Sequence, residues 1–307
     1  MAVVITTCTN RKRKPVADGL HASSLPKGNL RDVAGDWCAR IGATEARYPA
    51  TDLYGGRGFQ EANVVAGRLG APLLIVSAGL GLVRSETAVP SYACTVIAAA
   101  NDSIAERLTD GSSLADWWRA ISAGSPASCR VETAFDASDG LVLAALSDAY
   151  VDLIAAEVEA LPASARQRLR LFTRAPLHRI SDRLRPFVMP YDDRLDGPDS
   201  PVRGTRSDFA GRALRHFADY ILTQPDDRDA AGHAAAVAAA IADWSLPERH
   251  ERVRHDDPTL RTLIAEHWEA LGGSTSKLLP FFRRELNIAC EQGRFASLVR
   301  EVRSARA

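Results

Sequence analysis

The sequence lacks the cysteine patterns that metal sites and disulfide frameworks require. Its five cysteines stand singly, at positions 8, 38, 94, 129 and 290, and the sequence contains no Cys-x-x-Cys. Neither a zinc-binding module nor a disulfide-stapled domain is therefore expected. We expect no metal and no cofactor, and scattered free thiols fit a reducing, cytoplasmic environment.

An excess of one charge and long apolar runs are missing as well. The 307 residues carry 38 Lys and Arg against 38 Asp and Glu, so any basic site must be local. No apolar run reaches the roughly 18 residues of a membrane span, and the N-terminal apolar run is too short for a signal peptide. We expect a cytoplasmic protein without membrane contact.

Short apolar runs alternate with helical patterns in the first half. Residues 2–7, 73–77, 140–145 and 169–173 are rich in branched apolar side chains and indicate buried strands. Residues 58–69 and 147–161 have the apolar spacing of amphipathic helices. This alternation predicts an α/β fold, a mostly parallel sheet flanked by helices, with functional residues at the carboxyl ends of the strands.

The composition changes after about residue 185. Residues 186–208 are rich in Pro, Gly, Asp and Arg without periodicity, which indicates an ordered functional loop. Helical patterns then cover residues 209–222, 230–244, 258–271, 275–286 and 290–303. We expect a core domain at 1–185, a loop at 186–208 and a helical region at 209–307. Its last two helices form either a helix-turn-helix-like module or a packed helical hairpin.

The stretch LIVSAGLGLVRSETAVPSY, residues 74–92, contains an incomplete glycine motif. Arg84 stands where a dinucleotide-binding loop needs its third glycine, and Ile75 stands where a nucleophile elbow needs its first. Two interpretations remain, a plain structural turn or a wall of a ligand pocket. In the second, Gly79 and Gly81 allow close backbone approach beside Ser77, and Tyr92 stacks on the ligand.

A basic loop follows the first strand. The segment TTCTNRKRK joins Cys8 and Asn10 to four consecutive cations, residues 11–14. Such a loop clamps a phosphate backbone, lowers the pKa of the Cys8 thiol, or is a solvated surface loop. In the first case Asn10 reads a base edge. The backbone-binding residues we expect are Arg11, Lys12, Arg13, Lys14, Arg57, Arg203 and Arg206.

Two carboxylates stand beside aromatic residues near expected helix starts. Asp52 precedes Tyr54 in DLYGGRGF, and Asp148 precedes Tyr150 in ALSDAY. Each carboxylate either caps a helix or turn or takes part in catalysis. Each tyrosine either packs in the core or contacts a base.

Four phrases occur in order over residues 2–160: TTCTNRKRK, DLYGGRGF, VSAGLGLV followed by VPSY, and ALSDAY. In this order they resemble the YaaA-type peroxide-stress-resistance proteins and their relatives. The resemblance implies a DNA-binding α/β protein linked to protection from DNA damage, with features of uracil-DNA-glycosylase-like folds. The second half departs from the short members of that family, so it must supply something additional, such as substrate choice.

Together these residues predict a DNA glycosylase or related base-processing hydrolase acting on a modified or damaged base in double-stranded DNA. The base is extruded into a pocket, and Asp52 or Asp148 stabilises the sugar cation or holds the water. No lysine amine is expected in the pocket, so simple hydrolysis to an abasic site follows. A non-enzymatic DNA-binding stress-protection protein and an enzyme of free nucleosides or nucleotides are the alternatives. Defence against viruses with modified genomes would suit the first function.

Overall fold

The computed structural model describes residues 2–98, 100–136, 138–223, 226–248 and 252–306. They form two compact units, Met1–Pro247 and Glu248–Ala307, each with its own hydrophobic core. This division differs from the expected boundary at residue 209. Helix α8 (Phe209–His216) packs against α3 (Arg57–Leu69) and the sheet, so residues 209–247 belong to the first unit.

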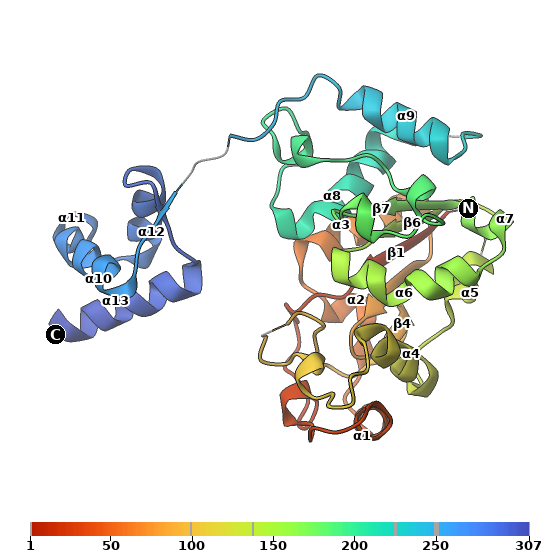
Figure 1. Cartoon of the computed structure of the whole chain (residues 1–307), viewed down its shortest axis with the longest axis horizontal. Helices are drawn as coiled ribbons and strands as arrows, with labels where there is room; N and C mark the ends of the chain where they lie inside the picture. The colour runs from red at the N-terminus through yellow and green to blue at the C-terminus, as the bar shows by residue number, and fades with distance from the viewer. Residues whose placement is uncertain (1, 99, 137, 224–225, 249–251, 307) are drawn as a thin grey trace. The chain divides into compact units, whose positions relative to one another are not determined.

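The first unit is built on a five-stranded sheet in the order β4-β3-β1-β6-β7 (Figure 1). Four strands are parallel: β1 (Val3–Thr7), β3 (Leu73–Ser77), β6 (Val142–Ala145) and β7 (Leu169–Phe172). Strand β4 (Gly81–Arg84) is antiparallel to β3. Ile5 pairs with Leu74 on one side and Ala144 on the other, which fixes the register. The expected α/β fold is confirmed.

The connections between parallel strands run in opposite directions on the two sides of the central strand β1. Its first crossover, through α3, leads to β3 on one side, and the later strands β6 and β7 lie on the other side. Because crossovers of this kind are right-handed, α3 and α6 (Asp148–Ala160) lie on opposite faces. The strand order therefore reverses between β1 and β6, at the carboxyl ends of both.

Helices cover both faces of the sheet. Helix α8 lies with α3, whereas α4 (Leu114–Gly124) contacts α6, β4 and α1 (Leu30–Ala43). Capping explains two starts that the apolar spacing alone did not reveal: Asn29 accepts from the Asp32 amide, and Ser113 forms a capping box with Asp116. The other α-helices of this unit are α2 (Ala50–Leu53), α5 (Val131–Asp136), α7 (Ala163–Arg166) and α9 (Ala230–Ala240). Two short strands, β2 (Tyr48–Pro49) and β5 (Ala88–Val89), form an antiparallel pair.

Residues 186–208 form an irregular segment of the first unit. It contains the 3-10 turns Asp193–Asp196 and Arg206–Asp208, and a third turn, Arg185–Phe187, opens it. The segment ends at Asp208, directly before the first residue of α8, and its last turn contacts α3 and α8.

The second unit consists of short helices around a two-stranded ladder. Its elements are β8 (Val253–Arg254), α10 (Asp257–Glu266), α11 (Trp268–Leu271), α12 (Thr275–Arg284), β9 (Ile288–Ala289) and α13 (Gln292–Arg306). Leu260, Phe282 and Phe295 are fully buried in its core. Strand β9, parallel to β8, lies where a helix-turn-helix would have its turn.

Within the described part of the chain, every helix is too short or too polar to cross a membrane.

Candidate functional site

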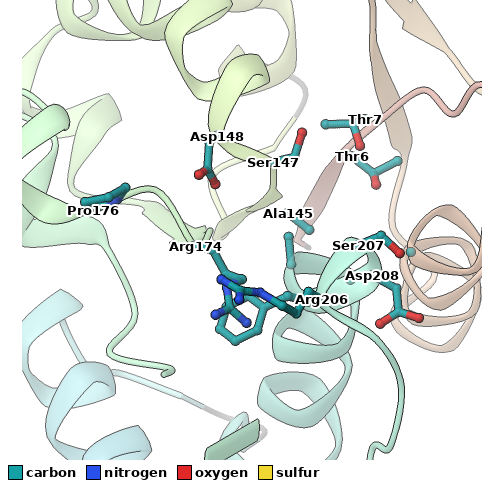
Figure 2. A pocket seen from close by; sticks show the side chains of 14 residues that line it. Thr6, Thr7, Ala145, Ser147, Asp148, Arg174, Pro176, Arg206, Ser207 and Asp208 are labelled. Carbon is teal, nitrogen blue, oxygen red and sulfur yellow. The ribbon is translucent and has the colours of Figure 1, made fainter. Parts of the chain in front are cut away.

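A cavity of about 390 Å³ opens at the carboxyl edge of the sheet (Figure 2). Strand β1 contributes Thr6 and Thr7, and the segment after β6 contributes Ser147 and Asp148. The cavity therefore lies where the strand order reverses, which is the position at which open α/β sheets bind ligands.

Two arginines and the first turns of three helices line this cavity. Arg174 follows β7, and Arg206 opens the 3-10 turn before α8. Gly58 belongs to the first turn of α3, Asp148 begins α6, and residues 207–211 include the start of α8. Helix N-termini present backbone amides and partial positive charge. With two guanidinium groups beside them, they favour an anion and above all a phosphate.

Asp148 is the carboxylate of this cavity that forms no hydrogen bond or ion pair with a described residue. It is half-buried in the first turn of α6, whose N-cap Ser147 makes no side-chain capping bond. In Figure 2 its side chain and those of Arg174 and Arg206 surround one space. The cavity thus holds one available carboxylate within surroundings that attract anions.

Asp208 lines the same cavity but has a different role. It is buried, and its Oδ1 accepts from the Thr205 amide at 2.8 Å and from Arg212 Nε at 2.7 Å. Arg57 lies 3.7 Å from its other oxygen. These bonds commit the Asp208 carboxylate to holding the loop onto α8.

Arg212 fastens the irregular loop to the core. Its side chain is fully buried and pairs with Asp196 as well as Asp208. It also donates to the carbonyl oxygens of Leu195, Val202 and Thr205. Gly204 approaches this arginine so closely that a Cβ there would lie 2.5 Å from Arg212 Cδ. The loop that carries Arg206 is therefore held by one buried guanidinium.

Arg174 stands between the main cavity and a second one. It pairs with Asp193 and with Asp196, the latter at 3.0 Å, and its guanidinium lies 5.0 Å from the centre of the Phe209 ring. Arg174 and Phe209 also line a neighbouring cavity of about 570 Å³. Leu177 and Leu246 line this second cavity with 56% and 65% of their surfaces exposed, so it offers apolar surface beside the polar cavity.

The glycine stretch forms a buried hairpin turn between β3 and β4. Ser77 Oγ accepts from the amides of Gly79 and Leu80 at 3.2 and 3.0 Å. Gly81 has the positive φ of 79° that favours glycine, and a Cβ on Gly79 would lie 2.8 Å from the Tyr92 ring. The close approach that the glycines allow is therefore to the protein's own side chains.

Three tryptophans complete this turn. Their indole nitrogens donate to consecutive carbonyl oxygens: Trp37 to Gly79 at 2.7 Å, Trp117 to Ala78 at 2.8 Å and Trp118 to Ser77 at 3.1 Å. Since Ser77, Ala78 and all three rings are buried, the polar groups of the turn are satisfied from inside the fold. The geometry supports the plain-turn interpretation of the stretch.

Tyr54 and Tyr92 are fully buried and bonded to each other, hydroxyl to hydroxyl, at 3.0 Å. Tyr92 is also 2.6 Å from Ser77 Oγ. Burial raises the pKa of both tyrosines, so both stay protonated at neutral pH. Neither ring lines a cavity described above, which leaves them no exposed face for stacking on a base.

Lys12 lies against these two rings, outside the main cavity, for which no lysine amine was expected. Its ammonium is 4.5 Å from the centre of the Tyr92 ring and 4.9 Å from that of Tyr54, and it donates to the Thr9 carbonyl at 2.6 Å. Burial lowers the pKa of Lys12. Lys12 borders a separate cavity of about 190 Å³ with Asn10 and Cys94, not the main one.

Cys8 and Tyr150 form another buried pair beside the sheet edge. Cys8 Sγ is 3.1 Å from the Tyr150 hydroxyl, and both residues are buried. Neither lines the main cavity, although Thr7 and Asp148, close to them in sequence, do. The pair lies in the interior next to the cavity wall.

The basic loop runs beside the segment that contains Asp52. The Arg13 amide donates to the Leu53 carbonyl and the Gly55 amide to the Arg11 carbonyl, both at 2.9 Å. Arg11, Arg13 and Asp52 are exposed, and Lys14 is half-buried. The main cavity is lined by none of these four side chains.

Arg57 and Arg203 are neighbours near the start of α3. Arg57 donates to the Arg203 carbonyl, pairs with Glu61 at 3.5 Å and is about half exposed. Arg203 is exposed and donates to the Pro198 carbonyl at 3.1 Å. Of the expected site residues, the structure brings only Asp148 and Arg206 together in the main cavity.

The sequence interpretation did not assign a site role to Arg174, Ser207 or Phe209. A usable signal existed for Arg174, which stands two residues after the buried run LRLF. No local signal marks Ser207 or Phe209, because α8 reaches the sheet edge only through tertiary packing.

Comparisons of the chain with protein-family models, with curated proteins and with solved structures gave no match.

Proposed function

We propose that the protein hydrolyses the N-glycosidic bond of a modified or damaged base in DNA, with Asp148 as the catalytic carboxylate. The observation that carries this proposal is the half-buried Asp148 in a cavity also lined by Arg174, Arg206 and three helix starts. A phosphate held by the cationic groups would bring the attached sugar within reach of the carboxylate.

The two adjoining cavities fit the parts of a nucleotide. The polar cavity of about 390 Å³ suits a phosphate and its sugar, and the neighbouring cavity of about 570 Å³ offers Leu177, Leu246 and Tyr191 to a base. Arg174 lines both, where its planar guanidinium contacts phosphate on one side and the base on the other. Extrusion of the nucleotide from the duplex would deliver it to this site.

The reaction needs little from the protein beyond binding and charge. As the bond between C1′ and the base nitrogen breaks, positive charge develops on the sugar, and the Asp148 carboxylate stabilises it. The oxygen of a water molecule then bonds to C1′, and its proton passes to Asp148 or to solvent. The base leaves with the bonding electron pair and takes up a proton, which leaves an abasic sugar.

A mass-spectrometric assay tests the proposal. Duplexes carrying different base modifications are incubated with the protein, and the released bases are identified. We expect release from at least one duplex, a loss of about 100-fold or more in Asp148→Asn, and little change in Asp152→Asn. Asp152 is the matched control because it lies one turn further along α6 and pairs with Arg179 outside the cavity.

Three results would contradict the proposal. Equal release by Asp148→Asn removes the proposed catalytic residue. Salt-dependent binding of DNA without release from any substrate indicates the non-enzymatic DNA-binding protein instead. Release from mononucleotides but not from DNA indicates the third function considered above.

An enzyme of free nucleotides is the second candidate, because one observation favours it. The basic side chains of residues 11–14 do not line the main cavity, so the strongest cationic stretch of the sequence supplies no group to the cavity itself. Comparing release from a modified mononucleotide with release from the same nucleotide in a duplex decides between the two.

A further inference from the structure

The C-terminal unit contains a cleft of about 700 Å³ lined by four arginines. Arg254 lies on β8, Arg252 directly precedes that strand, Arg283 lies in α12 and Arg294 in α13. Four guanidinium groups from separate parts of this unit thus meet at one concave surface. The cleft belongs wholly to the second unit and is separate from the Asp148 cavity.

The arginines of the cleft are poorly neutralised. Among the described residues, Arg252, Arg254 and Arg283 form no ion pair with a carboxylate, and only Arg294 does, with Asp257 at 2.6 Å. Elsewhere in the unit Arg261 pairs with Glu301 and Arg306 with Glu269, both at 2.8 Å. The cleft therefore brings three arginines without a described carboxylate partner to one concave surface.

Hydrogen bonds fix the directions of two cleft arginines without using all their donors. Arg252 Nε donates to the Arg283 carbonyl at 3.0 Å, and Arg283 Nη2 donates to the Cys290 carbonyl at 2.9 Å. Each guanidinium has five N–H donors, so donors remain for a ligand. Their positions are set before it binds.

The cleft also contains a carboxylate, Glu291, whose hydrogen bonds are committed elsewhere. It accepts from the Gly293 and Arg294 amides at 2.8 and 2.7 Å, and these bonds lower its pKa. Glu291 therefore caps the start of α13 and remains charged. It offsets only part of the positive charge of the cleft.

We infer that this cleft binds the phosphodiester backbone of DNA. Like charges clustered around one cavity repel each other, and an anion that bridges them relieves this repulsion. Guanidinium groups match phosphate oxygens in pairs, and a groove fits a strand of linked phosphates. The inference deepens the proposed function and rests on it for the identity of the polyanion as DNA.

Binding of the full-length protein to an unmodified duplex of about 20 base pairs, followed by fluorescence anisotropy at increasing salt, tests the inference. We expect Arg252→Ala/Arg254→Ala to weaken binding at least tenfold at low salt. The slope of log K against log salt should fall by about 2, one for each lost phosphate contact. Lys277→Ala/Arg300→Ala is the matched control, since both residues are exposed cations of the same unit outside the cleft.

Equal losses in the two double variants would overturn the inference, because charge alone and not the cleft would then matter. Binding of poly-glutamate as tight as binding of DNA, with the same loss in the cleft variant, would also overturn it in favour of an acidic protein partner. Base release from a mononucleotide depends on the Asp148 cavity and not on the cleft. Measuring this release in the cleft variant therefore separates a failure of the cleft inference from a failure of the proposed function. If Asp148→Asn alone abolishes release while the cleft variant binds DNA normally, the cleft inference fails and the function stands.

Discussion

The backbones of Gly58 and Gly211 are in contact where α3 and α8 cross at the rim of the Asp148 cavity. A Cβ on Gly211 would lie 2.4 Å from the Gly58 carbonyl oxygen and 2.8 Å from its Cα. Because both clashing atoms belong to backbone, only a shift of one helix relieves the overlap. This contact therefore sets the distance between two of the helix starts that line the cavity.

Gly211→Ala should lower the free energy of unfolding by about 1–3 kcal/mol through overpacking. It should also weaken phosphate binding, because α8 carries Phe209 and residues next to it at the cavity. Urea unfolding and calorimetry with inorganic phosphate measure the two effects. Gly67→Ala is the control: a Cβ there meets nothing within 4 Å, and it should stabilise α3 by up to about 1 kcal/mol. Equal stability of both variants would contradict the proposed helix contact.

The two arginines of the main cavity should respond differently to removal. Arg206 is exposed and forms no side-chain bond with a described residue, so Arg206→Ala should weaken anion binding several-fold and leave the unfolding midpoint unchanged. Arg174 is held by Asp193 and Asp196, so Arg174→Ala should weaken binding and also destabilise the fold, because it removes one cationic partner from each carboxylate. Titration with inorganic phosphate and urea unfolding separate the effects. Loss of stability in Arg206→Ala would contradict this assignment.

Gly79 should be a stability position and not a ligand contact. A Cβ on Gly79 would lie 2.8 Å from the Tyr92 ring and 3.1 Å from Cys94 Cβ. Gly79→Ala should therefore lower the free energy of unfolding by about 1–3 kcal/mol by overpacking. Phosphate binding by the protein that remains folded should be unchanged. A stable Gly79→Ala protein that has lost binding would restore the stretch as a pocket wall.

The buried strands were predictable because their side chains are apolar on both faces. Residues 73–77 match β3 at both ends, and the other three parallel strands differ from the expected ranges by one or two residues at an end. Strand β4 and helix α1 were missed. Strand β4 follows a turn of only three residues, and α1 lies in a stretch whose glycine and charged residues hide its apolar stripe.

The candidate site was predictable only in part. Parallel strands end at one edge, so the sequence placed Asp148 near the cavity, and its position after β6 is what the structure has. The sequence could not show which of Asp148 and Asp52 lies in the cavity. Asp52 lies in the short helix α2 and is exposed, and its exposure is set by tertiary packing. Nor could the sequence show that three tryptophans far from the glycine turn in sequence donate hydrogen bonds to its carbonyl oxygens.

His216 makes the stability of the first unit depend on acid pH. Its ring is buried, its Nδ1 lies 2.8 Å from the Tyr191 hydroxyl, and the rings of Tyr220 and Trp244 lie 4.9 and 5.0 Å away. Burial lowers its pKa from 6.5 to about 4, and the nearby Asp219 offsets only part of this effect. His216 is therefore neutral in the folded protein at neutral pH.

The unfolded chain takes up a proton at His216 before the folded protein does. The stabilisation from the neutral ring is therefore complete above pH 6.5, decreases as the pH falls from 6.5 to about 4, and levels off below that. The total loss is on the order of 3 kcal/mol. Urea unfolding of the wild type and of His216→Phe/Tyr191→Phe, compared between about pH 7 and pH 4, measures it. The double variant avoids an unpaired tyrosine hydroxyl and should lose less stability over this interval. Parallel curves for the two proteins would show that His216 does not titrate across it.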